Sequence, residues 1–306
     1  MQDTRAQVLD ALDAGPTSGP DLADRLDISR AAVWKHVEAL REAGFDVASR
    51  DDGYVLEGVP DYGSEAIEFG LEAPFEIEYH DTIDSTNSRG RELAQAGRED
   101  VVVLADAQTG GKGRLDREWA SPPGGVWLSL VLRPDIPTAS APIFTLAAAV
   151  ATTDAVGELG VEAGIKWPND VLVGEKKVAG ILTEMSGEMD RVSWIVVGIG
   201  INADVDGESV PTNATTLRER VGNVDRRRLV QSLLERFDEL RWDPSAVLPA
   251  WRELTVTLGR RVRIETPTET IVGTAVDVEF PGGLVVETDS GRRVVSAGDC
   301  EHLRPV

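Results

Sequence analysis

The hydrophobic pattern changes its period twice along the chain, and these changes predict three domains. Residues 1–58 carry apolar side chains at helical spacing, and residues 75–255 mix strand-like runs with helical segments. Residues 256–306 contain only short strand-like runs separated by Gly, Pro and Asp. Residues 59–74 hold Pro, Gly and acidic residues without a steady period, which is typical of a linker.

Residues 1–58 have the pattern of a winged helix-turn-helix. Ser29 is a good N-cap for a third helix, and Asp52-Gly53 lies between two β-prone runs, which predicts the hairpin that forms the wing. The apolar residues expected to line the inner faces of the helices are Val8, Leu9, Leu12, Leu22, Ala23, Leu26, Val33, Val37 and Leu40. The third helix is therefore the expected recognition helix.

The outer face of this third helix predicts contacts with operator DNA, since a recognition helix enters the major groove. The residues expected to make them are Arg30, Trp34, Lys35 and Arg41. Charge argues the other way, because residues 1–58 carry 12 acidic and 6 basic residues, whereas DNA-binding modules are usually basic. The alternative is a three-helix module used only for dimerisation or for covering the active site.

The other two domains predict an α+β protein. In residues 75–255 the strands are joined locally and the helices are grouped, so a mixed sheet is expected rather than a doubly wound one. The segment APIFTLAAAVATTDAVGELG predicts a long core helix. The short strands of residues 256–306 predict an SH3-like barrel.

The charge of the chain restricts its partners and suggests a habitat. There are 53 acidic and 31 basic residues, a formal net charge of −22, and such a surface repels membranes and phosphate backbones. An acidic, lysine-poor surface fits a high-salt cytoplasm, where screening is nearly complete, so a halophilic protein is a hypothesis. No signal pattern, no apolar run of about 18 residues and a single cysteine predict a cytoplasmic protein without a membrane partner.

The few lysines are candidates for special roles. The chain has 26 Arg but only five Lys, and four of these lie between residues 112 and 177. A compact ammonium contacts one phosphate or carboxylate oxygen where the planar guanidinium would not fit. The alternative is that these lysines are ordinary surface residues that remained by chance.

A glycine-rich cationic loop lies between two predicted strands. In TGGKGRLDREWASPPGG, several glycines accompany Lys112, Arg114 and Arg117, so backbone N–H groups can approach and hold a phosphate. The spacing is neither that of a P-loop nor that of a Rossmann fingerprint. The alternative is a flexible surface loop.

A second cluster surrounds Lys166. This lysine lies between Ile165 and Trp167, where burial without an anion would be costly. Asp170 can hold a metal ion or the ammonium of Lys177, and Gly180 leaves room for a ligand. The alternative is a structural ion pair at a hairpin. Upstream, Ser85 predicts a helix N-cap, whose first turn presents N–H groups to anions or polar groups.

These motifs resemble, in order and spacing, those of biotin protein ligases. The resemblance covers nearly the whole chain and is closest to the bifunctional kind, which also represses biotin genes. The motifs are Ser85-Thr86-Asn87, Gln108-Thr109, Gly111-Lys112-Gly113-Arg114, Arg117-Glu118-Trp119, Lys166-Trp167-Pro168-Asn169-Asp170, Lys177-x-x-Gly180 and Gly200-Ile201-Asn202. Lipoate ligases share the fold but lack the combination of KWPND and the GxGR loop. One departure is Lys112, where the family commonly has Arg; little loss is expected, because the backbone approaches the ligand there.

The resemblance implies a class II synthetase-like catalytic domain that makes biotinyl-5′-adenylate from biotin and ATP with Mg²⁺. It then transfers biotin to a lysine of a biotin carboxyl carrier protein. Implied biotin-binding residues are Ser85, Thr86, Asn87, Gln108, Gly111, Lys112, Gly113, Arg114, Lys177 and Gly180. Implied ATP-binding residues are Lys112, Arg114, Arg117, Trp119, Lys166, Asn169 and Asn202. Implied catalytic residues are Arg114, Lys166, Asp170 and Lys177, with Asp170 also as the metal ligand.

Two other readings stay open from the sequence. A lipoate- or octanoate-transferring enzyme would share the fold, and a regulator that senses biotin without ligating it would share the domains. The basic residues around 112–177 favour catalysis, because adenylation brings two anions together and their repulsion must be neutralised. As a repressor, the chain is expected to be a homodimer, two-fold like its operator.

Overall fold

The computed structural model describes residues 3–188 and 190–303, with the backbone alone at Asp3 and Asp116. The chain divides between Glu72 and Ala73 into two compact units, and each unit has its own core. The cavity described below is lined entirely by residues of the second unit.

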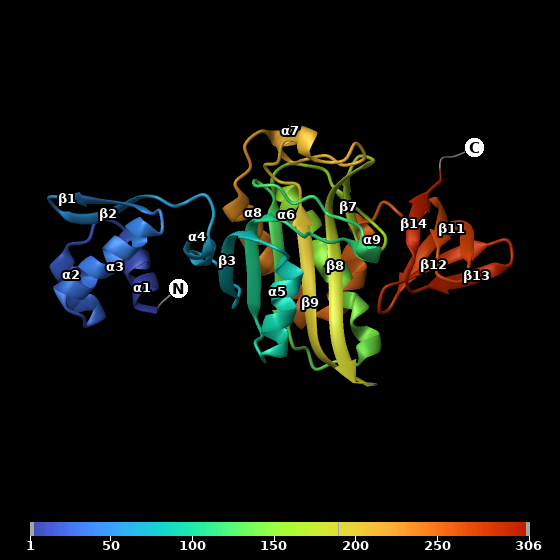
Figure 1. Cartoon of the computed structure of the whole chain (residues 1–306), viewed down its shortest axis with the longest axis horizontal. Coiled ribbons are helices and arrows are strands. Elements are labelled where there is room, and N and C mark those ends of the chain that lie inside the picture. The colour runs from blue at the N-terminus through green and yellow to red at the C-terminus, as the bar shows by residue number, and fades with distance from the viewer. Residues whose placement is uncertain (1–2, 189, 304–306) are drawn as a thin grey trace. The chain divides into compact units, whose positions relative to one another are not determined.

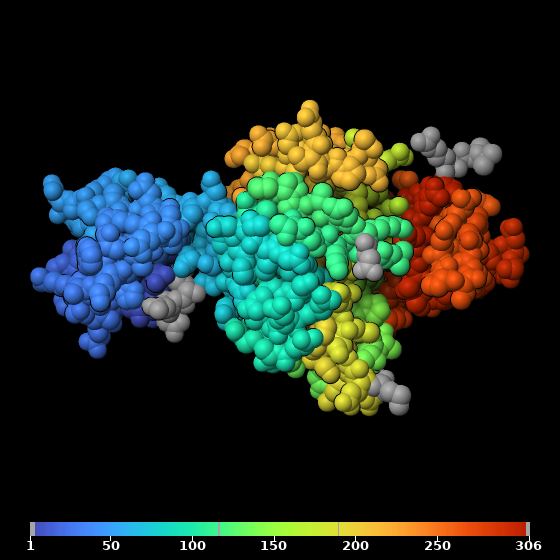
Figure 2. Space-filling model, in the orientation of Figure 1, coloured from blue at the N-terminus to red at the C-terminus, as the bar shows by residue number. Residues whose placement is uncertain are grey.

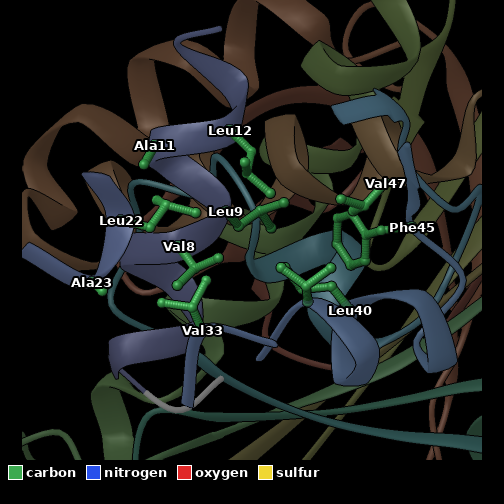
Figure 3. Close-up of a cluster of buried hydrophobic side chains, with 11 residues drawn as sticks. Val8, Leu9, Ala11, Leu12, Leu22, Ala23, Val33, Leu40, Phe45 and Val47 are labelled. Carbon is green, nitrogen blue, oxygen red and sulfur yellow. The ribbon is translucent and has the colours of Figure 1, made fainter. Parts of the chain in front are cut away.

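The first unit is a winged helix-turn-helix. Ser29 caps the third helix by accepting a hydrogen bond from the N–H of Ala32, as its sequence predicts. The three helices and the wing enclose a core of aliphatic side chains together with Phe45 (Figure 3). Its elements are α1 (Asp3–Asp13), α2 (Gly19–Leu26), α3 (Arg30–Glu42), β1 (Asp46–Arg50), β2 (Gly53–Gly58) and α4 (Ser64–Glu68).

The expected linker is partly structured. Residues Ser64–Glu68 form α4, Glu65 forms an ion pair with Arg5 at 3.1 Å, and Phe69 packs edge-on against Phe45 with 6.1 Å between ring centroids. Val59 also packs against the core of the first unit. The segment expected as a linker over 59–74 thus contains a short helix and packs in part on the core of the first unit. The helix is too short for a periodic pattern to be read from the sequence.

The second unit is built on a seven-stranded mixed sheet of order β3-β4-β5-β9-β8-β7-β6 (Figure 1). Only β3 and β4 are parallel neighbours, and the other adjacent pairs are antiparallel. This arrangement confirms the α+β prediction. The strands are β3 (Glu76–Ile83), β4 (Val101–Gln108), β5 (Val126–Leu132), β6 (Gly164–Lys166), β7 (Asp170–Val173), β8 (Lys176–Glu188) and β9 (Arg191–Ile201).

Helices cover both faces of this sheet. α5 packs on β4, β5 and β9, whereas α6 packs on the strands from β6 to β9 and is itself covered by α8 and α9. Val196 of β9 belongs to the cluster of buried residues under α5. The next residue, Val197, points to the other face of the sheet and pairs with Thr183, whose hydroxyl accepts a hydrogen bond from Thr145 of α6. The two helices therefore lie on opposite faces. The helices are α5 (Thr86–Gln95), α6 (Pro142–Glu158), α7 (Arg218–Val221), α8 (Arg226–Trp242) and α9 (Pro244–Leu254), with 3₁₀ turns at Arg114–Asp116, Thr138–Ser140 and Gly207–Ser209.

One described helical segment, Thr138–Glu158, is long and apolar enough to cross a membrane. Most of its apolar stretch is buried inside the protein, between the sheet and the outer helices. The segment thus has the surroundings of a core helix, as its sequence predicts.

The chain ends in a small antiparallel β domain. Its five strands form one sheet of order β13-β12-β11-β10-β14, in agreement with the all-β prediction. In Figure 2 this domain, in red, adjoins the green part of the second unit, where the glycine-rich loop lies. The strands are β10 (Arg261–Glu265), β11 (Thr270–Glu279), β12 (Gly283–Thr288), β13 (Gly291–Val295) and β14 (Asp299–His302).

Candidate active site

A cavity of about 410 Å³ lies over β5, β8 and β9 and is bordered by the glycine-rich loop. Nearly all the candidate site residues line it. They are Ser85, Thr86, Asn87, Gln108, Lys112, Gly113, Arg114, Arg117, Trp119, Lys166, Asn169, Asp170, Lys177, Gly180 and Asn202. Gly111 belongs to the loop itself, and its carbonyl accepts a hydrogen bond from the N–H of Trp119 at 2.9 Å. Sequence motifs that span more than a hundred residues thus meet in one place.

A cluster of neutral polar side chains forms one wall of the cavity. Ser85 caps α5, as expected, and this places Thr86 at the first helical position. The N–H and the hydroxyl of Thr86 both point to Oε1 of Gln108, at 2.8 and 3.1 Å. Nε2 of Gln108 donates to the hydroxyl of Ser121 at 2.9 Å. The side chains are therefore fixed by one another and offer a rigid polar wall.

Asn87 is buried and fully engaged by the protein. Its Oδ1 accepts from Ser129 at 2.6 Å, and its Nδ2 donates to Glu184 at 3.1 Å and to the carbonyl of Leu182 at 3.3 Å. Gly198 faces the amide so closely that a Cβ there would overlap Oδ1. Asn87 thus holds α5 to the sheet, and its amide groups already have partners.

The glycine-rich loop folds back on itself as a finger. The backbones of Lys112 and Glu118 form an isolated antiparallel β-bridge, and the N–H of Gly113 donates to the carbonyl of Arg117 at 2.7 Å. Its tip carries Leu115, which is 73% exposed and has φ = +56°. Hydrogen bonds within the loop and to other elements thus give it a defined path, although its glycines disfavour regular secondary structure.

The two arginines of the finger reach across to other elements. Arg114 donates to Oδ1 of Asn169 and to the carbonyl of Gly298, each at 2.9 Å. Arg117 forms an exposed ion pair with Asp299. The C-terminal β domain therefore takes part in holding the finger over the cavity.

Lys177 lies at the centre of the charged part of the cavity. Its Nζ is 2.6 Å from Oδ1 of Asp170 and 4.6 Å from the ring centroid of Trp119. The glycines beneath leave room for this arrangement: a Cβ on Gly180 would lie 2.9 Å from Nζ of Lys177, and one on Gly200 would lie 2.8 Å from Nε1 of Trp119. The indole N–H of Trp119 is buried, and within the described part of the chain it has no hydrogen-bond partner.

Two buried asparagines hold the backbone around this centre. Asn169 donates from Nδ2 to the carbonyl of Ile181 at 2.8 Å, which leaves its Oδ1 to Arg114. Asn202 donates to the carbonyl of Thr215 at 3.1 Å. Lys166, at the end of β6, is half-buried and has no carboxylate within 4 Å among the described residues.

A second, strongly polar cavity of about 310 Å³ adjoins the first and extends toward the C-terminal domain. The two share Arg114, Arg117, Lys166, Asn169, Asp170 and Asp299. Cys300 also lines it, and burial raises the pKa of its thiol to about 11, so this thiol is protonated at neutral pH.

The charge of the main cavity differs in sign from that of the chain. Five cationic and three acidic side chains line it, in a protein of net charge −22. Among the described residues there is no cluster of three His, Cys, Asp or Glu side chains that could hold a metal ion by themselves. Anionic ligands therefore suit this cavity, and a divalent cation would need oxygens from such a ligand.

Several lining or supporting residues were not singled out from the sequence. Ser129 could have been identified from the sequence, because it is the one hydroxyl side chain within the apolar strand VWLSLVL. Ser121, Glu184, Asp299 and the segment Val210–Ala214 had none, because only the tertiary fold brings them to the cavity.

In the first unit, Arg30, Trp34 and Lys35 are exposed on α3, and 56% of Trp34 is accessible. Arg41 is different: its guanidinium donates twice to the carbonyl of Val47, at 2.8 and 2.6 Å, and also contacts Glu38 and Ser49. The expectation that Arg41 lies on a free outer face was wrong, because it holds α3 to the wing.

Comparison with known proteins agrees with this architecture. Residues 79–202 match the biotin/lipoate A/B protein ligase family, residues 257–303 the biotin protein ligase C-terminal domain, and residues 4–55 a helix-turn-helix domain. The bifunctional ligase/repressor BirA of Bacillus subtilis is 40% identical over 93% of each chain. The chain belongs to the biotin protein ligase family.

Other members of the biotin protein ligase family match parts of the chain. The biotin--[acetyl-CoA-carboxylase] ligase of Mycobacterium tuberculosis is 36% identical over 72% of this chain and 86% of its own length. The biotin protein ligase of Aquifex aeolicus, solved in complex with biotin and ATP, is 28% identical, with a TM-score of 0.64, over 75% of this chain and 99% of its own.

Proposed function

We propose that the protein activates biotin with ATP and transfers it to a lysine of a biotin carboxyl carrier protein. The observation that carries this proposal is the cavity itself, where a rigid neutral wall around Gln108 adjoins five cationic side chains in an acidic chain. The neutral wall suits an uncharged polar ring system such as that of biotin. The cationic side chains suit the carboxylate of biotin and the phosphates of ATP.

In the first step, a carboxylate oxygen of biotin attacks the α-phosphorus of ATP. The bond from this phosphorus to the bridging oxygen breaks, and pyrophosphate leaves. Arg114, Lys166 and Lys177 offset the repulsion of the two anions and stabilise the charge that develops in the transition state. Lys112 and Arg117 add positive charge from the finger.

In the second step, the neutral amine of the carrier lysine attacks the carbonyl carbon of the mixed anhydride. AMP leaves, an amide forms and one proton is released. Asp170 is the candidate group to accept or orient this proton, and its contact with Lys177 at 2.6 Å holds the carboxylate in place. The finger shields the anhydride from water during this time.

Magnesium fits the site through one carboxylate, that of Asp170. Asp170 lines the cavity, and its Oδ1 lies 2.6 Å from Nζ of Lys177. Mg²⁺ commonly takes one or two carboxylates, while phosphates and waters supply its other ligands. Asp170 would therefore hold the ion together with ATP. The ion would add to the neutralisation of the phosphates.

The test is an isotope exchange between pyrophosphate and ATP in the presence of biotin, lipoate or octanoate. We expect exchange with biotin alone, followed by labelling of a carrier domain. Exchange with lipoate or octanoate instead would identify the related transferase. Biotin binding without any exchange would identify a sensor that does not ligate.

A second function, repression of transcription, is favoured by the exposed Arg30, Trp34 and Lys35 on α3 of a winged helix-turn-helix. We propose that a homodimer binds a two-fold operator through these residues. Because the module is acidic, the test is a gel shift in molar KCl, with and without biotin and ATP. Absence of a shift in every condition would refute DNA binding.

The charge also supports a proposal on habitat. A net charge of −22 with 26 Arg and five Lys suits a cytoplasm of high ionic strength, where the carboxylates are screened. The free energy of unfolding should rise as KCl is raised from millimolar to molar concentrations. A protein that is equally stable in dilute buffer would argue against a halophilic origin.

A further inference from the structure

The backbone on both sides of Lys166 is held by one short segment, residues 255–257, which leads from α9 into the C-terminal domain. The carbonyl of Ile165 accepts two hydrogen bonds at 2.9 Å, from the N–H of Val256 and the hydroxyl of Thr255. The N–H of Trp167 donates to the hydroxyl of Thr257 at 3.0 Å. These two groups belong to the two peptide planes that flank the Cα of Lys166.

Fixing these two planes fixes the direction of the lysine side chain. A residue has only two soft backbone dihedrals, φ and ψ, and they describe the orientation of the planes before and after its Cα. With both planes tied to residues 255–257, the Cα–Cβ bond of Lys166 has a set direction. Its side chain lines both cavities, and among the described residues no carboxylate lies within 4 Å to hold its ammonium there.

The hydroxyl of Thr257 depends in turn on His302. Thr257 is fully buried, its oxygen accepts from Trp167, and its oxygen lies 3.0 Å from Nε2 of His302 on β14. A hydroxyl has a single proton to donate, and Nε2 is the acceptor within reach. The hydroxyl of Thr257 makes both contacts when His302 is neutral with its proton on Nδ1, because Nε2 then accepts.

A second tie joins the same motif to the C-terminal domain. The indole N–H of Trp167 donates to the carbonyl of Gly282, in the turn between β11 and β12, at 2.9 Å. Trp167 is 1% exposed, so its backbone N–H and its indole N–H are both buried. Their acceptors are Thr257 and Gly282 respectively.

From this chain of contacts we propose that Thr257 and His302 are positioning residues for Lys166, so that the C-terminal domain controls how the ligase receives ATP. This inference rests on the proposed function, in which Lys166 binds the phosphates. Neither residue touches the reacting atoms. They act through the Lys166–Trp167 peptide plane.

The test compares Thr257→Val with Thr257→Ser and the wild-type protein. Valine keeps the shape but leaves the N–H of Trp167 and Nε2 of His302 without a partner, and we expect roughly tenfold weaker ATP binding and a higher KM for ATP. The KM for biotin and the transfer of biotin from preformed biotinyl-adenylate should be unchanged. Serine restores the hydroxyl and should restore the affinity for ATP.

A matched control is Thr152→Val, because Thr152 is also fully buried and its hydroxyl donates to a carbonyl within α6 at 2.7 Å. It should leave the KM for ATP at its wild-type value. If Thr257→Val does not fold, His302→Gln, which keeps a hydrogen-bonding side chain, and His302→Leu, which does not, give the same comparison.

The outcomes separate the two proposals. Equal ATP affinity in wild type, Thr257→Val and His302→Leu would overturn the positioning role. Equal losses in the ATP, biotin and transfer measurements would also overturn it, since they would mean general disruption. A wild-type protein that binds ATP but shows no biotin-dependent exchange would refute the proposed function, and the ATP affinities of the variants would still decide the positioning role.

Discussion

Lys177 has three neighbours that make its charge effective: a carboxylate at 2.6 Å, an indole face at 4.6 Å and a glycine beneath. The carboxylate and the indole hold the ammonium in place before any ligand arrives. Little reorganisation is then needed when the charge of the transition state develops, which is the condition under which such groups contribute most.

Lys177→Ala should lower biotin-dependent pyrophosphate exchange by roughly 10²–10³, the scale for losing one donor to a developing charge. Lys176→Ala is the matched control, because it removes the same charge from the neighbouring exposed residue of β8. Initial rates of exchange for both variants check the prediction. Equal losses in the two would mean that only net charge matters.

His302 predicts a dependence of stability on pH. Burial, together with the charges of Lys166 and Arg260, lowers the pKa of His302 to about 4, below its ordinary value of 6.5. Between these values the unfolded chain binds more protons than the folded one, so stability falls as pH falls from 6.5 toward 4. Urea unfolding at pH 7 and pH 5 should therefore show a smaller loss for His302→Gln than for wild type. Identical losses would contradict this account.

At the residue scale, the sequence predicted which residues gather at the cavity better than what each one does there. The contact between Lys177 and Asp170 was foreseen as one of two possibilities for that carboxylate. The engagement of Asn87 by Ser129 and Glu184 was not, because those partners come from different strands. Such contacts depend on the register between strands, which side-chain chemistry alone does not reveal.

At the scale of elements, β8 and β9 lie side by side under the finger, and their glycines form the floor of the cavity. Gly180 pairs with Gly200 across the two strands, and both face Trp119. Because neither glycine has a side chain, the indole of Trp119 and the ammonium of Lys177 can lie close to the sheet.

Gly200→Ala should displace the indole of Trp119, since the added Cβ would lie 2.8 Å from Nε1. We expect a loss of about 1–3 kcal/mol in the free energy of unfolding and weaker nucleotide binding. Gly157→Ala in α6 is the control, because its Cβ would meet no atom within 4 Å and a helix prefers alanine by up to about 1 kcal/mol. Urea unfolding and ATP titration measure both effects. An unchanged ATP affinity in Gly200→Ala would contradict this view of the floor.

Long elements were predictable from the sequence, whereas short ones were not. The core helix α6 and the N-cap of α3 follow from local patterns of apolar and capping residues. The five-residue α4 and the finger around Arg114 follow from tertiary contacts, with Arg5 and Phe45 in one case and Asn169 and Gly298 in the other.

At the scale of the whole molecule, the division at Glu72 separates DNA-binding candidates from ligase candidates. Every lining residue of the cavity belongs to the second unit. The three-domain expectation had the helix-turn-helix end at residue 58, but Val59 and Phe69 pack on its core. A pattern of apolar residues identifies the helices of a module more easily than the irregular segment that completes its core.

Removing residues 1–72 should leave biotin-dependent exchange unchanged and abolish any binding to DNA. Removing only residues 1–58 should leave Val59 and Phe69 without the core they pack on, so this shorter deletion should aggregate more readily. Exchange rates and light scattering of the two truncated proteins test the prediction. A loss of exchange in the longer deletion would show that the first unit contributes to catalysis.

The scarcity of lysine has a consequence for self-modification. A biotinyl-adenylate is an acylating reagent, and the groups it labels most readily are neutral amines, whereas guanidinium groups stay protonated and inert. In this chain two of the five lysines, Lys166 and Lys177, are half-buried at the cavity, and Lys35, Lys112 and Lys176 are the exposed ones. A surface that carries its positive charge on arginine offers few amines to the reagent made inside it, so more of the activated biotin is left for the carrier.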